Sequence, residues 1–248
     1  PCTASVNSSY GYSEPGKVKI DMTEYLKKMV EEFPEPVQGV SYPWNSNLIT
    51  VDTKSPKLSK DKAEVFHTFV AKALFVCKRA RQDVQPAVAF MTTRVREPND
   101  GDWCKLKRMM GFLKETQDDV LTLEADSAGV ITWHVDASFA VHEDFKSHTG
   151  ATMSLGTGVI QSLSVKQKVN TRSSTEAELV SLDDVIAKVL WTKLFLEAEG
   201  YKIKQNVIFR DNQSSMKLEQ NGKTSSGKHI TDLIKNGEVS IEYCPTDA

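Results

Sequence analysis

The chain has 248 residues, of which 40% are hydrophobic and 26% are charged, as in an ordinary soluble globular protein with one large domain or two modest ones. The 31 basic and 33 acidic residues give a net charge of −2, so any nucleic-acid-binding surface would have to be local. The four cysteines are scattered, without a CxxC pair or zinc-ligand spacing, which predicts reduced thiols rather than a disulfide framework.

The sequence contains no sign of membrane insertion or secretion. No apolar run approaches the roughly 20 residues that a membrane-spanning helix needs. The first residues also lack the basic-then-apolar layout of a signal peptide. We therefore expect an intracellular protein, in the cytoplasm or the nucleus, without a transmembrane segment.

The first part of the chain is predicted to be mostly helical. Residues 1–17, rich in Ser, Gly, Pro and Tyr, are expected to form a loop or tail. A short strand over residues 18–22 leads to a helix that Thr23 caps and Pro34 ends. Residues 36–60 contain three prolines and no sustained periodicity, which indicates an extended connector.

Apolar residues at helical spacing follow, in residues 63–79 and again in residues 102–114, with a second apolar segment over residues 85–92. The last of these helices carries basic side chains, of which Lys105 and Arg108 are candidate contacts to a nucleic-acid backbone. A basic helix face is more often simply solvated, so that interpretation remains open beside the functional one.

From Val120 the hydrophobic period changes to two, which predicts four β segments with glycine and serine turns. A helix over residues 175–199, a strand over 206–209, a short helix over 214–220 and a strand over 237–243 complete the pattern. We expect an α/β domain with a mixed five-stranded sheet and flanking helices. The predicted segments are a tail, helix and connector (1–60), a helical segment (61–119) and the α/β domain (120–248).

Three acidic positions fall at the ends of the predicted core elements. Asp136 lies in the apolar run ITWHVDASF, Asp211 ends the run NVIFRD, and Glu176 and Glu178 lie in the first turn of the long helix. Taken singly, each aspartate has a structural alternative, because an aspartate at a strand end commonly caps a turn or a helix. Together they can gather at one edge of a sheet, as a Mg²⁺ site requires.

The helix phase separates the two glutamates. At about 100° per residue, Glu178 lies on the apolar stripe that packs on the sheet, whereas Glu176 is directed roughly 200° away. An acid two or three residues after Ser173 or Ser174 is also a helix-start signature, which is a sufficient structural explanation for Glu176. We therefore predict Asp136, Glu178 and Asp211 as metal ligands, with Glu176 in reserve.

Divalent ions held by these carboxylates, Mg²⁺ or Mn²⁺ in its place, would support phosphoryl chemistry by activating a water and stabilising the leaving oxygen. Nearby polar residues are candidate contacts to phosphates or to ribose 2′-hydroxyls, although each alone is more often a turn or cap residue: Ser138, Ser174, Asn212 and Gln213. His229 is the histidine that we would test as a proton shuttle.

Several stretches closely resemble one family. HVDASF, SHTGATMSLGTGVIQSLSVKQK, STEAELVSL, FRDNQSSMKL, SSGKHI and GEVSIEYCPT resemble the ribonuclease H domain of copia-type LTR retrotransposon polyproteins. The stretches HTFVAKALFVCKRARQDVQPAVAFMTTRV and DWCKLKRMMGFLKET are similar to the connection segment that precedes that domain. GKVKIDMTEYLKKMVEEFP resembles the end of the polymerase thumb.

The resemblance implies a ribonuclease H fold that cleaves the RNA strand of an RNA–DNA hybrid, with Mg²⁺ on Asp136, Glu178 and Asp211. It also implies partners among the other parts of a polyprotein or a larger assembly. The sequence contains no YxDD-type polymerase motif. A generic nuclease of the same fold is a weaker alternative, because the STEAE and DNQS motifs favour this family.

The sequence departs from the family pattern at two places. The family has a basic and aromatic stretch between SSGK and the last helix, whereas Ser225–Ile230 continues directly into TDLIKNGEVS. The family also has a fourth acidic residue beyond the last strand, before which this sequence stops, and Asp247 could replace it only by folding back. We expect three carboxylates to bind one ion, and a second more weakly. The alternative is a catalytically inactive structural or nucleic-acid-binding subunit.

Overall fold

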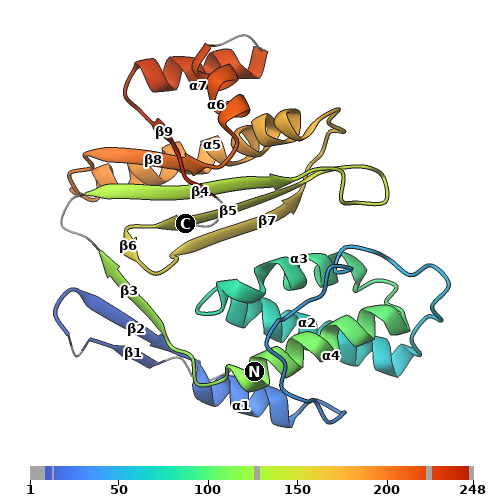
Figure 1. Cartoon of the computed structure of the whole chain (residues 1–248). Helices are drawn as coiled ribbons and strands as arrows, with labels where there is room; N and C mark the ends of the chain where they lie inside the picture. The colour runs from blue at the N-terminus through green and yellow to red at the C-terminus, as the bar shows by residue number, and fades with distance from the viewer. Residues whose placement is uncertain (1–8, 13, 126–128, 222–224, 246–248) are drawn as a thin grey trace. The chain divides into compact units, whose positions relative to one another are not determined.

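A computed structural model of the chain describes residues 9–12, 14–125, 129–221 and 225–245. These residues fall into two compact units that divide between Leu123 and Glu124 (Figure 1). The finer division of the chain at residues 60 and 119 stays a prediction. Asp247 and Gly222, the latter expected near the end of a short helix, lie outside the described residues.

Unit 1 is a helical bundle with a small amount of β-structure. Its elements are β1 (Ser9–Gly11), β2 (Lys17–Asp21), α1 (Thr23–Glu31), α2 (Lys60–Cys77), the 3₁₀ helix η1 (Gln82–Val84), α3 (Gln85–Arg94), α4 (Asp100–Glu115) and the start of β3 (Leu121–Ala125). One core joins the helices, and Phe33 after α1 stacks on Trp103 of α4 with ring centroids 5.5 Å apart. The predicted helices of this half are therefore present.

Two local predictions for unit 1 were wrong. Residues 9–11 were expected in a loop but form β1, because Ser9, Tyr10 and Gly11 pair antiparallel with β2. Thr23 was expected to cap α1, yet it is the first helical residue. The N-cap position is Met22, whose side chain makes no capping bond, and the carboxylate of Asp21 accepts a hydrogen bond of 2.8 Å from the Thr23 backbone nitrogen.

The expected connector is confirmed as a stretch without a helix or extended strand, apart from an isolated bridge at Lys57. Side chains of α4 hold it in place. The Lys107 amine donates to the Glu35 carboxylate at 2.8 Å, and the Lys114 amine donates to the Val37 carbonyl at 3.0 Å. The basic face of α4 is therefore used partly for holding the connector.

Unit 2 is built on the mixed five-stranded sheet that the sequence predicted. Its elements are β4 (Val130–Ser138), β5 (His148–Ser154), β6 (Gly156–Thr157), β7 (Gln161–Lys166), α5 (Ser174–Ala198), β8 (Gln205–Arg210), α6 (Gln213–Asn221), α7 (Ser225–Lys235) and β9 (Ser240–Tyr243). The strand order in this sheet is β7-β5-β4-β8-β9. The end of β3 adds a short antiparallel pairing of Glu124 and Ala125 with β6.

The central strand β4 sets the geometry of the site. It runs antiparallel to β5 and parallel to β8. In the parallel pair His134 lies opposite Phe209, so continuing this register by two residues brings Asp136 beside Asp211. On the other side of β4, Asp136 lies opposite Gly150. The two aspartates are therefore neighbours across the sheet although they are far apart in the sequence.

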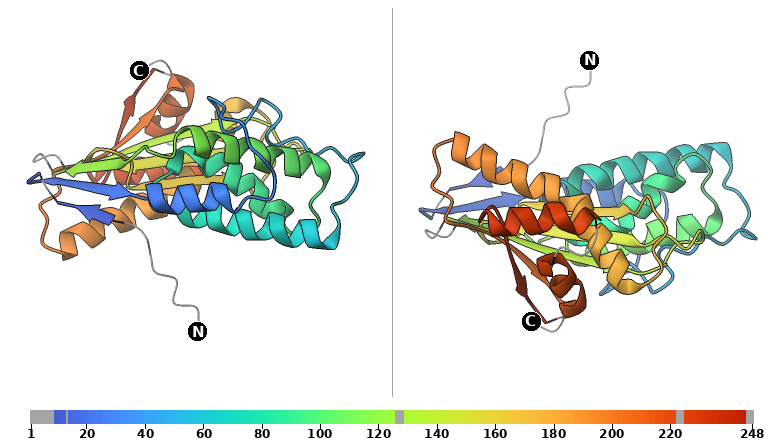
Figure 2. Two further views of the ribbon diagram at one scale, coloured as in Figure 1. Left: turned by 90° about the horizontal axis from the view of Figure 1, so that it is seen from below. Right: turned by 90° about the horizontal axis from the view of Figure 1, so that it is seen from above.

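Helix α5 packs on β4 and β5, across one face of the sheet (Figure 1 and Figure 2). Alternate residues of β4, namely Ile131, Trp133 and Val135, are almost fully buried in the core beneath it. Burying a side chain of this size contributes about 1.5–3 kcal/mol. This packing fixes the direction in which the first turn of α5 meets the end of β4.

A helix was missed in unit 2: α7, over SSGKHITDLIK, because its glycine and serines favour a turn. Its stabilisation is tertiary, since α7 packs with α6, Ile230 is 1% exposed and the Thr231 hydroxyl donates to the Glu219 carbonyl. Within the described part of the chain, no helix combines the length and the apolar character that crossing a bilayer would need.

Candidate metal centre

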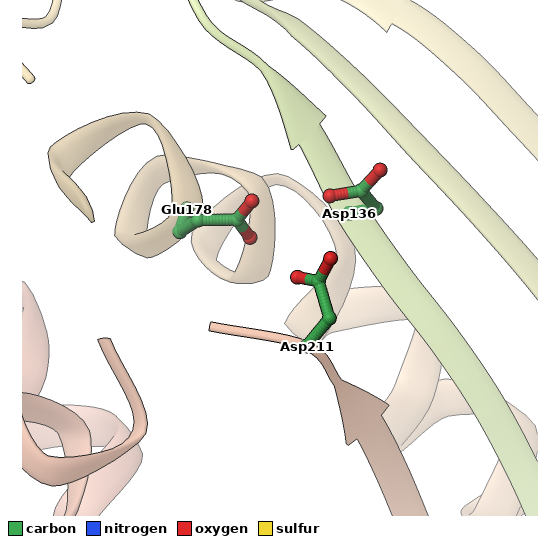
Figure 3. Close-up of side chains that lie close together, drawn as sticks. All are labelled: Asp136, Glu178 and Asp211. Atoms are coloured by element: carbon green, nitrogen blue, oxygen red, sulfur yellow. The ribbon is translucent and has the colours of Figure 1, made fainter. Parts of the chain in front are cut away.

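Three carboxylates meet at the end of the β4–β8 pair. Asp136 comes from β4, Glu178 from the first turns of α5, and Asp211 directly follows β8. One oxygen from each lies within 4.8 Å of the others, and Figure 3 shows the side chains directed toward one another. Among the described residues, no other three His, Cys, Asp or Glu side chains meet this closely. The structure thus brings together the three residues predicted as ligands.

The backbone after Asp136 ties the strand to the helix. The Ala137 nitrogen donates to Asp136 Oδ1 at 2.8 Å and to Glu178 Oε1 at 3.2 Å. One amide therefore orients two of the three carboxylates. Because β4 is the central strand of the sheet, these two side chains are placed by rigid elements rather than by a loop.

The three carboxylates differ in their environment. Asp136 and Asp211 are exposed, whereas Glu178 is 4% exposed. Burial raises the pKa of Glu178 to about 7; the Arg210 guanidinium opposes this rise, and the nearby Asp136 adds to it. Gathering like charges around a buried acid is unfavourable without a cation. The charge distribution therefore fits a site for a positive ion.

Arg210, which sequence reasoning missed, is the nearest basic group to Glu178. It is the last residue of β8, is 2% exposed, and forms an ion pair with Glu178 Oε2. It also forms an ion pair with the wholly buried Glu219 of α6, at 2.5 Å. Burial raises the pKa of Glu219, and the positive charge of Arg210 opposes this rise without cancelling it. The only signal in the sequence was a basic residue directly before Asp211.

Glu176 lies where the helix phase predicted, away from the cluster. It is exposed, and its carboxylate accepts a hydrogen bond of 2.6 Å from the Arg172 backbone nitrogen. The Ser173 hydroxyl in turn accepts one from the Glu176 nitrogen at 3.2 Å. These two bonds form the start of α5, and they account for Glu176 without a metal.

The predicted substrate-contact residues of unit 2 lie on three elements around the cluster. Ser138 is the exposed last residue of β4, Ser174 is the exposed first residue of α5, and Gln213 is the exposed first residue of α6. Asn212 has a structural task, because its side-chain oxygen accepts bonds from two backbone nitrogens of α6 at 3.0 and 3.1 Å. His229 is exposed on α7 and is not one of the clustered groups.

The two predicted contacts on α4 are held within unit 1. The Lys105 amine donates to the Thr50 carbonyl and lies 4.2 Å from the centroid of the Phe90 ring. Arg108 is half-buried, and among the described residues its buried Nε has no hydrogen-bond partner. Their contact with nucleic acid stays a prediction.

The donor set fits a hard divalent ion. All three groups offer carboxylate oxygens, which Mg²⁺ and Mn²⁺ prefer, and two of them are open to solvent, which leaves room for water and phosphate oxygens around an ion. None of the three is histidine or cysteine, the usual ligands of zinc. The residues present therefore suit a Mg²⁺-type centre.

Comparison with known proteins points to one group. The chain is 25% identical over 211 residues to the retrovirus-related Pol polyprotein from transposon TNT 1-94 of Nicotiana tabacum, covering 83% of this chain and 16% of the polyprotein. It is 31% identical over 134 residues to the corresponding polyprotein from transposon RE2 of Arabidopsis thaliana, covering 53% and 9%. The chain thus spans less than a fifth of these plant polyproteins.

Other comparisons give weaker similarities. The chain is 26% identical over 123 residues to the secreted RxLR effector protein 161 of Plasmopara viticola, covering 49% of this chain and 87% of that protein. A solved ribonuclease H1 isolated from compost by a metagenomic approach covers 48% of this chain at a TM-score of 0.37 and 11% identity. No family model matches. The chain is homologous to part of the Pol polyproteins of plant transposons, which is consistent with the resemblance to retrotransposon polyproteins.

Proposed function

We propose that unit 2 is a metal-dependent endonuclease of the ribonuclease H type, which hydrolyses the RNA strand of RNA–DNA hybrids. The observation that carries this proposal is the convergence of Asp136, Glu178 and Asp211 within 4.8 Å at the end of two adjacent parallel strands. The homology to transposon Pol polyproteins supports a ribonuclease H-like domain.

The proposed site would hold Mg²⁺, or Mn²⁺ in its place, which supplies positive charge and Lewis acidity beside the scissile phosphate. Asp136 and Asp211 present their oxygens on the solvent side, where a phosphate can approach. Glu178 reaches the same point from the buried side, with one carboxylate oxygen on Arg210 and the other on the Ala137 amide. One ligand is thus fixed, and the two others are accessible.

Polar side chains around the cluster are proposed to orient the hybrid. Ser138, Ser174 and Gln213 are exposed and suited to hydrogen bonds with phosphates or 2′-hydroxyls. Asn212 would contribute only beside its capping task. We keep His229 as a proposed proton shuttle, and Lys105 and Arg108 as proposed backbone contacts. Other parts of the polyprotein are the proposed partners.

One observation favours a second candidate function. Because Glu178 already has a buried cationic partner in Arg210, the cluster is less in need of a metal than three unpaired carboxylates would be. This favours a catalytically inactive subunit of a larger assembly, which binds nucleic acid or has a structural role. Cleavage and binding must therefore be measured separately.

The test is cleavage of an end-labelled RNA–DNA hybrid in Mg²⁺ and in Mn²⁺, beside binding of the same hybrid. Double-stranded DNA and double-stranded RNA of the same sequence serve as substrate controls. Asp136→Asn should lose cleavage and keep binding. Asp183→Asn, the same chemical change at an exposed position of α5 outside the cluster, should cleave like the unaltered protein. Binding without cleavage would support the inactive subunit.

A further inference from the structure

The side chain of Arg210 is buried in the interior of unit 2, at the end of β8 and directly before Asp211. Its residue is 2% exposed, and its guanidinium lies among α5, β8 and α6. A buried cation is costly unless it is paired and hydrogen-bonded, because the free energy lost on removing the charge from water is larger than the gain from packing its side chain. Its contacts therefore show what the arginine does.

The guanidinium lies between two carboxylates. Nη2 contacts Glu178 Oε2, and it also donates to the Glu178 carbonyl at 2.5 Å and to the Ser181 hydroxyl at 3.1 Å. Nη1 donates to Glu219 Oε1 at 2.5 Å. The planar fork of arginine presents a separate nitrogen to each partner in a fixed geometry, whereas lysine has one nitrogen on a flexible stem. Glu219 thus anchors the arginine, and the arginine holds Glu178.

The two oxygens of Glu178 have different partners. Oε2 is taken by Arg210, and Oε1 accepts the Ala137 amide on the side of Asp136. Rotation of the Glu178 carboxylate would break its contact with Arg210 and leave a buried charge without a partner. We infer that Arg210 is a positioning residue that holds Glu178 so that Oε1 alone is offered to the divalent ion. This inference rests on the proposed metal centre.

The alternative is that Arg210 and Glu219 form a structural ion pair and that Glu178 would be oriented equally well without them. Charge and orientation can be separated, because lysine keeps the positive charge but not the fork. Partners of this kind typically contribute 10- to 100-fold to metal affinity. Arg210→Lys should therefore weaken Mn²⁺ binding at least tenfold.

The experiment titrates Mn²⁺ into the whole chain and follows free Mn²⁺ by electron paramagnetic resonance, with the thermal midpoint measured for every variant. Arg172→Lys is the chemical control, at an exposed arginine whose side chain has no described role at the cluster. Val189→Ala is the stability control, because it opens a cavity in the core under the same helix. Both controls should bind Mn²⁺ within about twofold of the unaltered chain.

Three results separate this inference from the proposed function. Weaker binding by Arg210→Lys than by a control of equal thermal midpoint supports the positioning role. Unchanged Mn²⁺ binding by a folded Arg210→Lys protein overturns the positioning role. If Asp136→Asn abolishes Mn²⁺ binding in the same experiment, the metal centre itself still stands. An unaltered chain that binds no Mn²⁺ at the cluster overturns both.

Discussion

Asp136→Asn tests the electrostatics of the cluster, because it removes one negative charge and keeps nearly the same shape. Oxygens of the three carboxylates lie within 4.8 Å of one another. Two unit charges at 4.8 Å repel by about 0.9 kcal/mol in water and about 3.5 kcal/mol at an effective dielectric constant of 20. Asp136 is exposed, so the lower end applies, and we expect the metal-free variant to be more stable by about 1–2 kcal/mol at pH 8.

The gain in stability should depend on pH. The pKa of Glu178 is raised from 4.5 to about 7, so the folded chain loses stability as pH rises from the unfolded-state value through about 7. Below pH 5 Glu178 is protonated and repels Asp136 little. The stabilising effect of Asp136→Asn should therefore be largest above pH 7 and shrink toward pH 5. Removing Asp136 should also lower the pKa of Glu178.

The assay is thermal unfolding in a chelator at pH 5 and pH 8, where 1 kcal/mol corresponds to about 2–4 °C for a chain of this length. Asp183→Asn is the matched control and should change neither midpoint by a comparable amount. Adding Mg²⁺ should raise the midpoint of the unaltered chain but not that of Asp136→Asn. An equal gain at both pH values, or none at pH 8, would show that like-charge repulsion is not a feature of this cluster.

Two further predictions concern single elements. Glu178→Gln should lose Mn²⁺ binding and cleavage, whereas Glu176→Gln should keep both. Glutamine keeps the oxygen that accepts the Arg172 nitrogen, so Glu176→Gln should lose only about 0.3–1 kcal/mol, from the missing charge at the start of α5. The reverse pattern in the two assays would assign the ligand to Glu176. If Lys105, Lys107 and Arg108 contact the hybrid, neutralising all three should flatten the dependence of log binding constant on log salt concentration. An unchanged slope would leave Lys105 and Lys107 with their contacts to Thr50 and Glu35 and remove all three from the proposed interface.

The cluster was predictable because it depends on local periodicity. Strand alternation and apolar runs placed Asp136 and Asp211 at the ends of core strands, and the 3.6-residue period chose Glu178 over Glu176. The structure brings these three side chains together. The long apolar elements of the sheet were predictable for the same reason, since their burial is visible in the sequence itself.

Features that depend on contacts between distant elements were not predictable. The burial of Arg210 requires Glu178 from one helix and Glu219 from another, and no local pattern connects the three. Helix α7 was missed because its first residues favour a turn, while packing against α6 stabilises it. The start of α1 was misplaced because threonine is a common N-cap residue, whereas the structure has Met22 at the N-cap and an Asp21 carboxylate bonded to the Thr23 nitrogen.

Strand β8 ends at Arg210, which is buried in the interior and paired with Glu178, and Asp211 of the acidic cluster follows directly. Because successive residues of a strand point to opposite faces, a slip of one position would exchange them. A guanidinium would then enter the acidic cluster, and a carboxylate would enter the core beside Glu219. A one-residue insertion within β8 would therefore exchange the charges at these two positions and leave a buried charge without its partner.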